Sequence, residues 1–302
     1  MQPDSQIPPA DRRLPVGEEI FLDHVAHFVR DRDAAGRALQ RAGFAPTPAS
    51  VQVNPDPGGG PARLTGTGNI TAMFPHGYTE VLFKTADTPL AAEFDAALQR
   101  YPGVHLVAFA VANAESWHRR LAAHGFRLRP LLDMQRPVDI DGTPGTAAFT
   151  LARLEPGEMS EGRIQMLTHR TEHAVWQRRW LTHANGALAL VRVVIAVADV
   201  DEAASRFARF TQRPVSTSRF DRTIVLDRGR LDLIAAESFE RLLPEVAIPS
   251  LPFMGAYEIR VRSLAAVHDV LEKSGMRTRS AERMLIARFP EELGHGAWLF
   301  TE

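Results

Sequence analysis

A strand pattern that changes into a helix pattern stands near the start of the chain. Residues 20–29 are almost continuously apolar and predict a strand, and from Asp31 to residue 42 the apolar positions take on helical spacing. Gly43 follows, as expected just past a helix C-terminus. Further strand patterns occur near residues 44–53, 68–75 and 78–84. The predicted order of this unit is therefore β-α-β-β-β.

The same order is predicted three more times. These units begin with strands at 104–111, at 190–197 and at 256–261, and a helix pattern follows each of them. Recurrence at this spacing indicates internal duplication. One such unit leaves a face of its small sheet uncovered, so two units are expected to share a core. We predict an α+β fold of four βαβββ modules, paired into two half-barrel domains.

The predicted boundaries divide the chain into four segments. Residues 1–18 are rich in proline and charge and are expected to form a flexible arm. The two domains are predicted at 19–168 and 188–302. Residues 169–187 lie between them and are interpreted as a crossover helix.

Composition narrows the classes of function and site. With 35 basic and 36 acidic residues, the net charge of -1 provides no field for nucleic acid or an anionic membrane. No apolar run reaches the ~20 residues of a membrane span, so we expect a cytoplasmic protein. The chain has no cysteine, and any metal must therefore bind His, Asp, Glu or Gln. Whether the protein forms a homodimer is left open.

Three stretches carry a resemblance to a known superfamily. They are Leu22-Asp23-His24-Val25-Ala26 with the following Asp31-Arg32-Asp33-Ala34-Ala35, then Gly66-Thr67-Gly68-Asn69, then Gly77-Tyr78-Thr79-Glu80-Val81-Leu82. They resemble the vicinal oxygen chelate (VOC) superfamily, which includes glyoxalases, bleomycin-resistance proteins and extradiol dioxygenases, and most closely its glyoxalase-like branch. The resemblance is specific for the fold rather than for the reaction, because this fold hosts several functions.

The resemblance implies a metal site in the first domain. In this superfamily one ligand lies at the start of a module's first strand and another in its last strand, and His24 and Glu80 occupy these positions. An imidazole and a carboxylate suit Fe(II), Mn(II), Ni(II) or Zn(II). The matching positions of the second module are Leu106 and Gln165. Gln165 is either a neutral ligand or a group that hydrogen-bonds the substrate.

The second histidine of the superfamily's pattern is displaced here by one residue, to His105. Such a shift turns a side chain to the opposite face of a strand. His105 is therefore a metal ligand only if a β-bulge near Gly103 turns it inward. The matching positions of the second domain read Arg192 with Asp232, and Ala256 with Leu299. We expect an ion pair between Arg192 and Asp232, and a second domain that acts as a scaffold.

Four residues are expected to contact the substrate. Trp176 and Trp180 share an i, i+4 spacing, which would place them on one face of the crossover helix, where they lock it onto the first domain or form an aromatic pocket wall. His169 is expected to reach the site from a strand end, and Phe109 is the fourth contact.

The resemblance implies a divalent-metal-dependent lyase, isomerase or dioxygenase. Its substrate would be a small organic molecule with two adjacent oxygens, and Glu80 would also be the catalytic base in an isomerase-like reaction. The alternative is a metal-free binding protein of the bleomycin-resistance type, which Leu106 favours. A third hypothesis gives the second domain a role in dimerisation.

Overall fold

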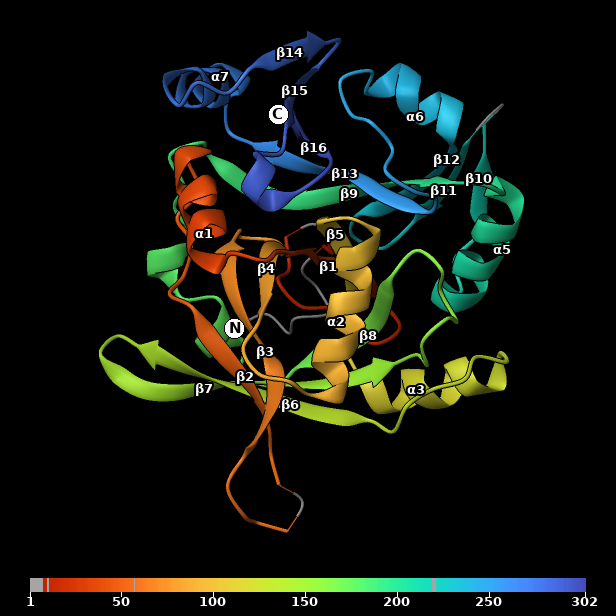
Figure 1. Cartoon of the computed structure of the whole chain (residues 1–302). Coiled ribbons are helices and arrows are strands. Elements are labelled where there is room, and N and C mark those ends of the chain that lie inside the picture. The colour runs from red at the N-terminus through yellow and green to blue at the C-terminus, as the bar shows by residue number, and fades with distance from the viewer. Residues whose placement is uncertain (1–7, 10, 57, 219–220) are drawn as a thin grey trace.

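The computed structural model describes residues 8–9, 11–56, 58–218 and 221–302. Within these ranges the chain forms sixteen strands and seven α-helices, and the order β-α-β-β-β occurs four times (Figure 1). The first unit contains β1 (Ile20–Phe28), α1 (Arg32–Arg41), β2 (Ser50–Asn54), β3 (Arg63–Met73) and β4 (Tyr78–Lys84). The second contains β5 (Gly103–Val111), α3 (Ala114–Ala123), β6 (Leu132–Ile140), β7 (Thr143–Arg153) and β8 (Arg163–His169).

The second half of the chain repeats this order. Its units contain β9 (Ala187–Val197), α5 (Val200–Thr211), β10 (Val215–Thr217), β11 (Asp221–Val225) and β12 (Arg230–Ala235), and then β13 (Phe253–Val261), α7 (Leu264–Lys273), β14 (Thr278–Ala281), β15 (Met284–Arg288) and β16 (Ala297–Thr301). The remaining helical segments are α2 (Pro89–Arg100), α4 (Glu172–Val175), η2 (Arg178–Trp180), α6 (Ala236–Leu242) and η3 (Glu291–Leu293).

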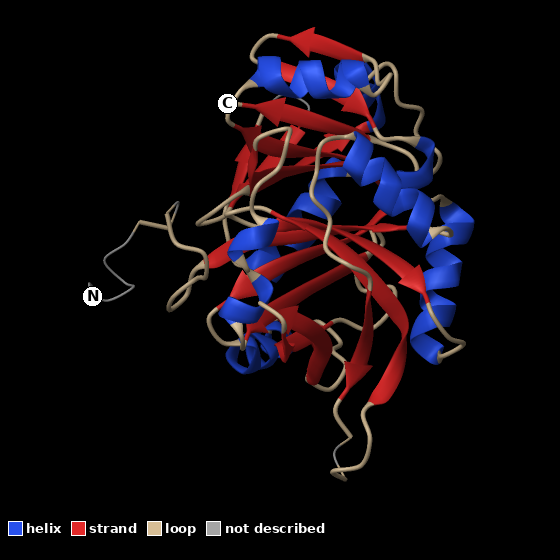
Figure 2. Ribbon diagram, turned by 90° about the vertical axis from the view of Figure 1, so that its left-hand side faces the viewer, coloured by secondary structure: helices blue, strands red, loops and turns tan. Residues whose placement is uncertain are grey.

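The first eight strands close into a barrel. Their order is β1-β4-β3-β2-β6-β7-β8-β5, and β5 pairs with β1. The predicted half-barrel is closed because β2 and β6 also pair, through Val53 and Gln135. The second half has the order β10-β11-β12-β9-β13-β16-β15-β14 and stays open, since β10 and β14 do not pair within the described ranges. Figure 2 shows the barrel below this open sheet.

The two halves share one hydrophobic core. Strands β5 and β13 meet at Val104 and Met254, and Leu22, Val107 and Tyr257 belong to the same buried cluster. Burying apolar side chains from both halves together stabilises their contact. The outer faces of β1 and β5 are therefore covered by the second half, while their inner faces line the barrel.

Two predicted segments differ from the observed ones. The interval between the halves is not one continuous helix, because Trp176 and Gln177 leave helical dihedral angles between α4 and η2. Part of the predicted arm lies outside the described residues. In its described part Arg12 and Pro15 are buried, so this stretch packs on the body of the protein. In the described ranges no helix is both long and apolar enough to cross a bilayer.

Candidate functional site

A cavity lies inside the barrel, and its lining follows the alternation of strand side chains. Inward residues recur at every second position, such as Tyr78, Glu80 and Leu82 on β4. The cavity has a volume of about 30 Å³, which is enough room for a water molecule or an ion. The lining residues are His24, Gln52, Asn69, Tyr78, Glu80, Leu82, Leu106, Met134, Arg136, Phe149, Leu151, Arg153, Arg163, Gln165 and Leu167.

The structure brings His24 and Glu80 together inside the barrel. Strands β1 and β4 are parallel neighbours, and His24 Nε2 lies 3.7 Å from Glu80 Oε2. Both side chains are only 6% exposed. The Tyr78 ring stacks on the imidazole at 4.4 Å between ring centroids. Burial and the neighbouring carboxylates of Asp23 and Glu80 raise the pKa of Tyr78 well above its ordinary value, so it stays protonated.

Asp23 fixes the orientation of His24. A β-bulge in β1, seen as a register shift against β5 between Leu22 and His24, contains Asp23. Its carboxylate accepts a hydrogen bond from His24 Nδ1 at 2.7 Å and another from His169 Nε2 at 2.9 Å. Burial alone would raise the pKa of Asp23, but the charges and hydrogen bonds of His169 and His24 hold it well below its usual range. The ionised Asp23 leaves His24 Nε2 directed at Glu80.

Glu80 is held by two amides. Asn69 Nδ2 donates to its Oε1 at 2.5 Å, and Gln52 Nε2 approaches the same oxygen at 3.4 Å. These bonds leave Oε2 as the oxygen that faces His24. Asn69 is one of a series of polar residues at every second position of β3. This alternation is visible in the sequence and would have predicted that Asn69 faces the same side as the other polar residues. The buried polar residues of this face are Thr65, Thr67, Asn69 and Thr71.

Three arginines also line the cavity, and the sequence analysis missed them. Arg136, Arg153 and Arg163 come from β6, β7 and β8. Burial lowers the pKa of Arg136 and Arg163, while burial together with the charges of Arg163 and Arg129 lowers that of Arg153 to about 9. The walls around Glu80 therefore carry more positive than negative charge. Each of these arginines lies two positions along its strand from another residue that lines the cavity. This spacing could have predicted that they point inward.

Gln165 lies in the cavity as predicted from its strand position. It is buried, and its Oε1 accepts a hydrogen bond from Arg153 Nε at 3.1 Å. Leu106 lines the cavity at the matching position of the first strand of that module. The second module thus contributes an amide and a leucine where the first contributes a carboxylate and an imidazole.

His105 occupies a β-bulge, but the bulge does not bring it to His24. The register between β1 and β5 shifts from Leu106 to Val104 and passes over His105. Its Nε2 donates to the Tyr101 carbonyl at 2.6 Å, and its ring stacks on that of Tyr101. His105 lines a different cavity from His24. Burial lowers its pKa to about 4, so the ring is neutral near pH 7.

The four expected substrate contacts lie outside the lining of the barrel cavity. Phe109 faces the shared core and packs against Phe210, because alternation turns it away from the inward side of β5. Trp176 lies behind Tyr78 and donates its indole N–H to the Phe74 carbonyl. Trp180 lines an outer hollow, since the helix is interrupted between the two tryptophans. His169 supports Asp23 instead of reaching the cavity.

The second half contains the expected ion pair. Arg192 Nη1 lies 3.1 Å from Asp232 Oδ2, and Arg192 Nε lies 2.8 Å from Glu258 Oε2. The sequence analysis did not include Glu258. The Arg192 guanidinium thus forms ion pairs with two carboxylates at the position that corresponds to His24 and Glu80.

The donor atoms at His24 and Glu80 fit a divalent cation. Two metal–ligand bonds of about 2.1 Å at a roughly tetrahedral angle place their donor atoms about 3.4 Å apart, close to the observed 3.7 Å. A carboxylate on the other imidazole nitrogen, as Asp23 provides, is the usual support of a metal-bound histidine. Gln165 also lines this cavity, although its Oε1 already accepts a hydrogen bond from Arg153. No group of three His, Cys, Asp or Glu suited to a metal occurs in the part of the chain that the structure describes.

The closed eight-stranded barrel, with polar side chains in its interior and helices outside it, is a mixed helix and strand fold of the VOC class. The chain belongs to the glyoxalase-like domain family, whose model matches residues 22–211. This membership confirms the resemblance to the VOC superfamily. A comparison with curated proteins found no match.

Solved structures with a similar fold include three that cover most of this chain. A hypothetical protein from Staphylococcus aureus has a TM-score of 0.64 at 9% identity and covers 93% of this chain and 98% of its own. A triple mutant of 4-hydroxymandelate synthase from Streptomyces coelicolor has a TM-score of 0.56 at 13% identity, and the match covers 94% of this chain and 93% of the synthase. The Mn(II)-bound glyoxalase from Novosphingobium aromaticivorans has a TM-score of 0.55 at 13% identity, and the match covers 94% of this chain and 81% of the glyoxalase. At these identities the similarity concerns the fold.

Proposed function

We propose that this protein is a divalent-metal-dependent enzyme that acts on a small organic substrate with two adjacent oxygens. The observation that carries the proposal is the 3.7 Å approach of His24 Nε2 and Glu80 Oε2 inside a closed barrel. His24, Glu80 and Gln165 would hold the cation. The Mn(II)-bound glyoxalase among the similar structures supports metal use on this fold.

Each residue around the site would have a separate role in the proposed reaction. The bound cation would polarise the substrate oxygens and stabilise negative charge on them. Glu80 would take a proton from the substrate and return it, as in a lyase or isomerase, by leaving the cation during turnover, while the amides continue to hold its Oε1. Asp23 keeps the His24 ring in position, and the guanidinium of Arg136 stabilises anionic oxygen in a site shielded from water. A dioxygenase reaction would use the same ligands.

The test is metal binding by protein purified without chelators. We expect close to one equivalent of metal, and a free metal concentration 100-fold above its dissociation constant should raise the free energy of unfolding by about 2.7 kcal/mol. Thermal unfolding with added Mn(II), Fe(II), Ni(II) or Zn(II) measures this. His24→Ala and Glu80→Gln should abolish the effect, whereas His268→Ala, at an exposed position on α7, should keep it. Less than a tenth of an equivalent, with no response to any of the four metals, would contradict the proposal.

The second candidate function is metal-free binding of a small molecule. Leu106 favours it, because this residue stands where a second module histidine would complete a ligand set. Ligand binding by chelator-treated protein that His24→Ala leaves unchanged would support this candidate.

We also infer that the four modules arose by internal duplication. The support is their shared strand order: β1-β4-β3-β2 in the first is repeated as β5-β8-β7-β6, as β9-β12-β11-β10 and as β13-β16-β15-β14. The second domain would then be a scaffold that has lost the ligands.

A further inference from the structure

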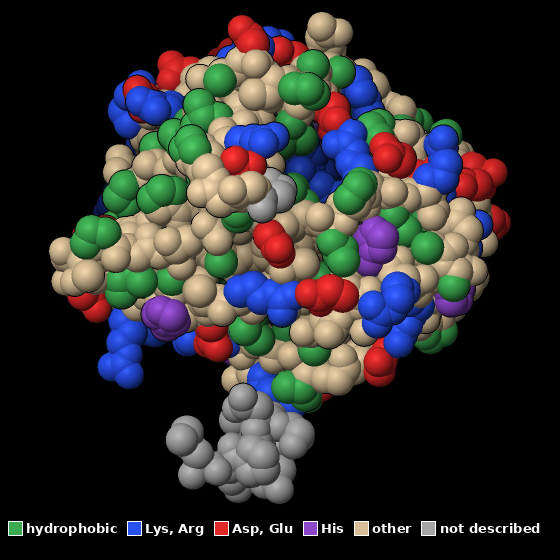
Figure 3. All heavy atoms as spheres, turned by 90° about the horizontal axis from the view of Figure 1, so that it is seen from below, with side chains coloured by type: hydrophobic (Ala, Val, Ile, Leu, Met, Phe, Trp, Pro, Cys, Tyr) green, Lys and Arg blue, Asp and Glu red, His purple; other side chains and the backbone are tan. Residues whose placement is uncertain are grey.

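A second and larger cavity adjoins the barrel interior. It lies between α2, β8 and the segment after β7, and its volume is about 360 Å³, which is in the range of small-molecule sites. Arg153 and Arg163 line both this outer cavity and the inner one that contains His24. Arg153 also lines a third hollow beside β3 and the start of α2. Seen from below, the molecule has a hollow with Lys or Arg side chains inside it (Figure 3).

Positive charge exceeds negative charge in the outer cavity. Its lining contains Arg100, Arg129, Arg153 and Arg163 against two carboxylates, those of Glu93 and Glu155. Both carboxylates are already engaged by Arg129. His105 adds no charge near pH 7, because burial lowers its pKa to about 4.

Arg153 and Arg163 are largely buried but have little negative charge beside them. Within the described residues the Arg153 side chain has no carboxylate within 4.0 Å, and its one side-chain hydrogen bond is from Nε to Gln165. The Arg163 guanidinium lies 3.9 Å from a Glu93 oxygen and over the Phe28 ring. Exposure is 8% for the whole of Arg153 and 15% for the Arg163 side chain. Buried charge that is only partly compensated is unfavourable, so these positions favour binding of an anion.

We propose that Arg153 and Arg163 bind an oxyanion group of the substrate, a carboxylate or a phosphate. The two guanidinium groups offer planar pairs of N–H donors, which match either group. The substrate would place its acidic end at the junction of the two cavities and its adjacent oxygens at His24 and Glu80. This inference rests on the proposed function for the identity of the substrate, while the oxyanion site itself can be tested without it.

The test is calorimetric titration with inorganic phosphate and with malonate at constant ionic strength, with chloride as the reference. We expect the unmodified protein to bind at least one of the two, and the tighter one identifies the acidic group. Arg153→Met and Arg163→Met should each weaken this binding at least tenfold. Arg119→Met, at an exposed position on α3, is the matched control and should not change it. Arg153→Lys keeps the charge and should retain part of the affinity, which separates loss of charge from loss of folding.

The outcomes separate this inference from the proposed function. If the unmodified protein binds neither anion more tightly than chloride, or if both Met variants bind as it does, the inference is overturned. Oxyanion binding that His24→Ala preserves while Mn(II) binding is lost supports both proposals. Oxyanion binding by a protein that binds no metal supports the oxyanion site and contradicts the metal-dependent function.

Discussion

Two histidines three positions apart on β1 show how surroundings set the role of one side chain. His24 faces the barrel interior and meets Glu80, while His27 faces the second half of the chain. His27 donates from Nδ1 to the Leu293 carbonyl at 2.9 Å, and its Nε2 accepts from the Tyr257 hydroxyl at 2.9 Å. Both of its ring nitrogens are hydrogen-bonded in the neutral form, so it has a packing role.

The burial of His27 predicts how stability depends on pH. Burial lowers its pKa to about 4, against about 6.5 when the chain is unfolded. Between these values the unfolded chain binds more protons than the folded one, so the free energy of unfolding falls as the pH is lowered from about 6.5 to about 4. Across this whole window His27 contributes a loss of about 3 kcal/mol. Above pH 6.5 its contribution does not change with pH.

Urea unfolding at several pH values measures this effect. His27→Gln keeps a donor and an acceptor but cannot titrate, so its free energy of unfolding should vary less steeply with pH, by up to about 1.4 kcal/mol per pH unit. His268→Gln, on the exposed side of α7, should follow the unmodified protein. Identical slopes for His27→Gln and the unmodified protein would show that His27 is not buried in the neutral form.

At the scale of elements, bulges and a tight turn build the site. The bulge in β1 positions Asp23 beside His24, and the turn before β4 lies close to this bulge. Gly77 in this turn has φ +77°, and a Cβ there would lie 2.7 Å from the Asp23 carbonyl oxygen. A side chain at this position would therefore push against the bulge that holds Asp23.

Gly77→Ala is predicted to damage both stability and the site. The left-handed conformation alone costs a non-glycine residue about 1–2 kcal/mol. Gly125→Ala is a matched control, because Gly125 has φ +81° with nothing within 4 Å of the added Cβ. Gly125→Ala should lower the free energy of unfolding only by this conformational cost. Gly77→Ala should lower it by more and should also weaken Mn(II) binding. Equal losses in both variants, with unchanged Mn(II) affinity, would show that the turn does not position Asp23.

These elements also explain which predictions from the sequence were reliable. Strong periodicity located β1, α1 and β4, and the meeting of His24 and Glu80 was predicted from the resemblance to the VOC superfamily. Asp23 was missed because regular alternation places it opposite His24, and only the bulge makes the two act together. The place of His105 could not be predicted for a related reason, since a bulge alone does not determine where the ring points.

Helix α2 was also missed, although the signals were present. Thr88 caps it through the backbone N–H of Ala91, and Pro89 occupies its first turn. Its buried residues, Ala91, Phe94 and Leu98, follow helical spacing. This helix lies between two units and has no place in the recurring β-α-β-β-β order, and it forms one wall of the outer cavity.

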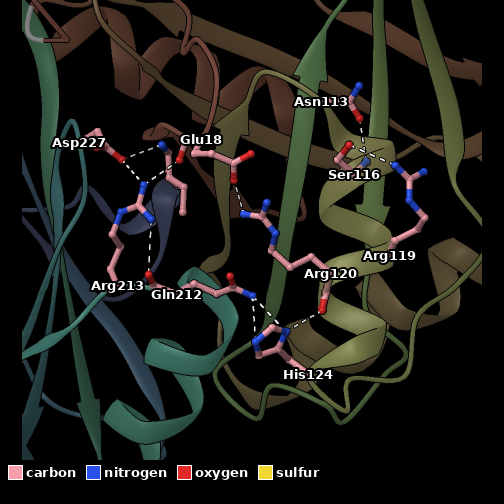
Figure 4. A network of polar contacts seen from close by, with 10 residues as sticks. Glu18, Asn113, Ser116, Arg119, Arg120, His124, Gln212, Arg213 and Asp227 are labelled. Atoms are coloured by element: carbon pink, nitrogen blue, oxygen red, sulfur yellow. Dashed lines mark hydrogen bonds and ion pairs between the residues drawn. The ribbon is translucent and has the colours of Figure 1, made fainter.

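At the scale of the whole molecule, the second half covers the outer faces of β1 and β5, and the barrel interior is formed by the first half alone. The shared core and a polar junction hold the two together. Figure 4 shows part of this junction, where α3 meets the end of α5. Gln212 Nε2 lies 3.1 Å from His124 Nδ1, and Arg120 pairs with Glu18. The ion pairs of Arg192 in the second half occupy the position that corresponds to His24 and Glu80 in the first, which agrees with the proposed scaffold role.

The central claim is that His24 and Glu80 form a cation site inside the closed barrel. Anomalous X-ray diffraction from crystals of the protein soaked in Mn(II) tests it most directly. We predict a manganese peak within bonding distance, about 2.0–2.3 Å, of His24 Nε2 and Glu80 Oε2, and no such peak in His24→Ala crystals. A barrel interior without anomalous signal under soaking conditions that label other sites, or a peak that persists in His24→Ala, would contradict the account.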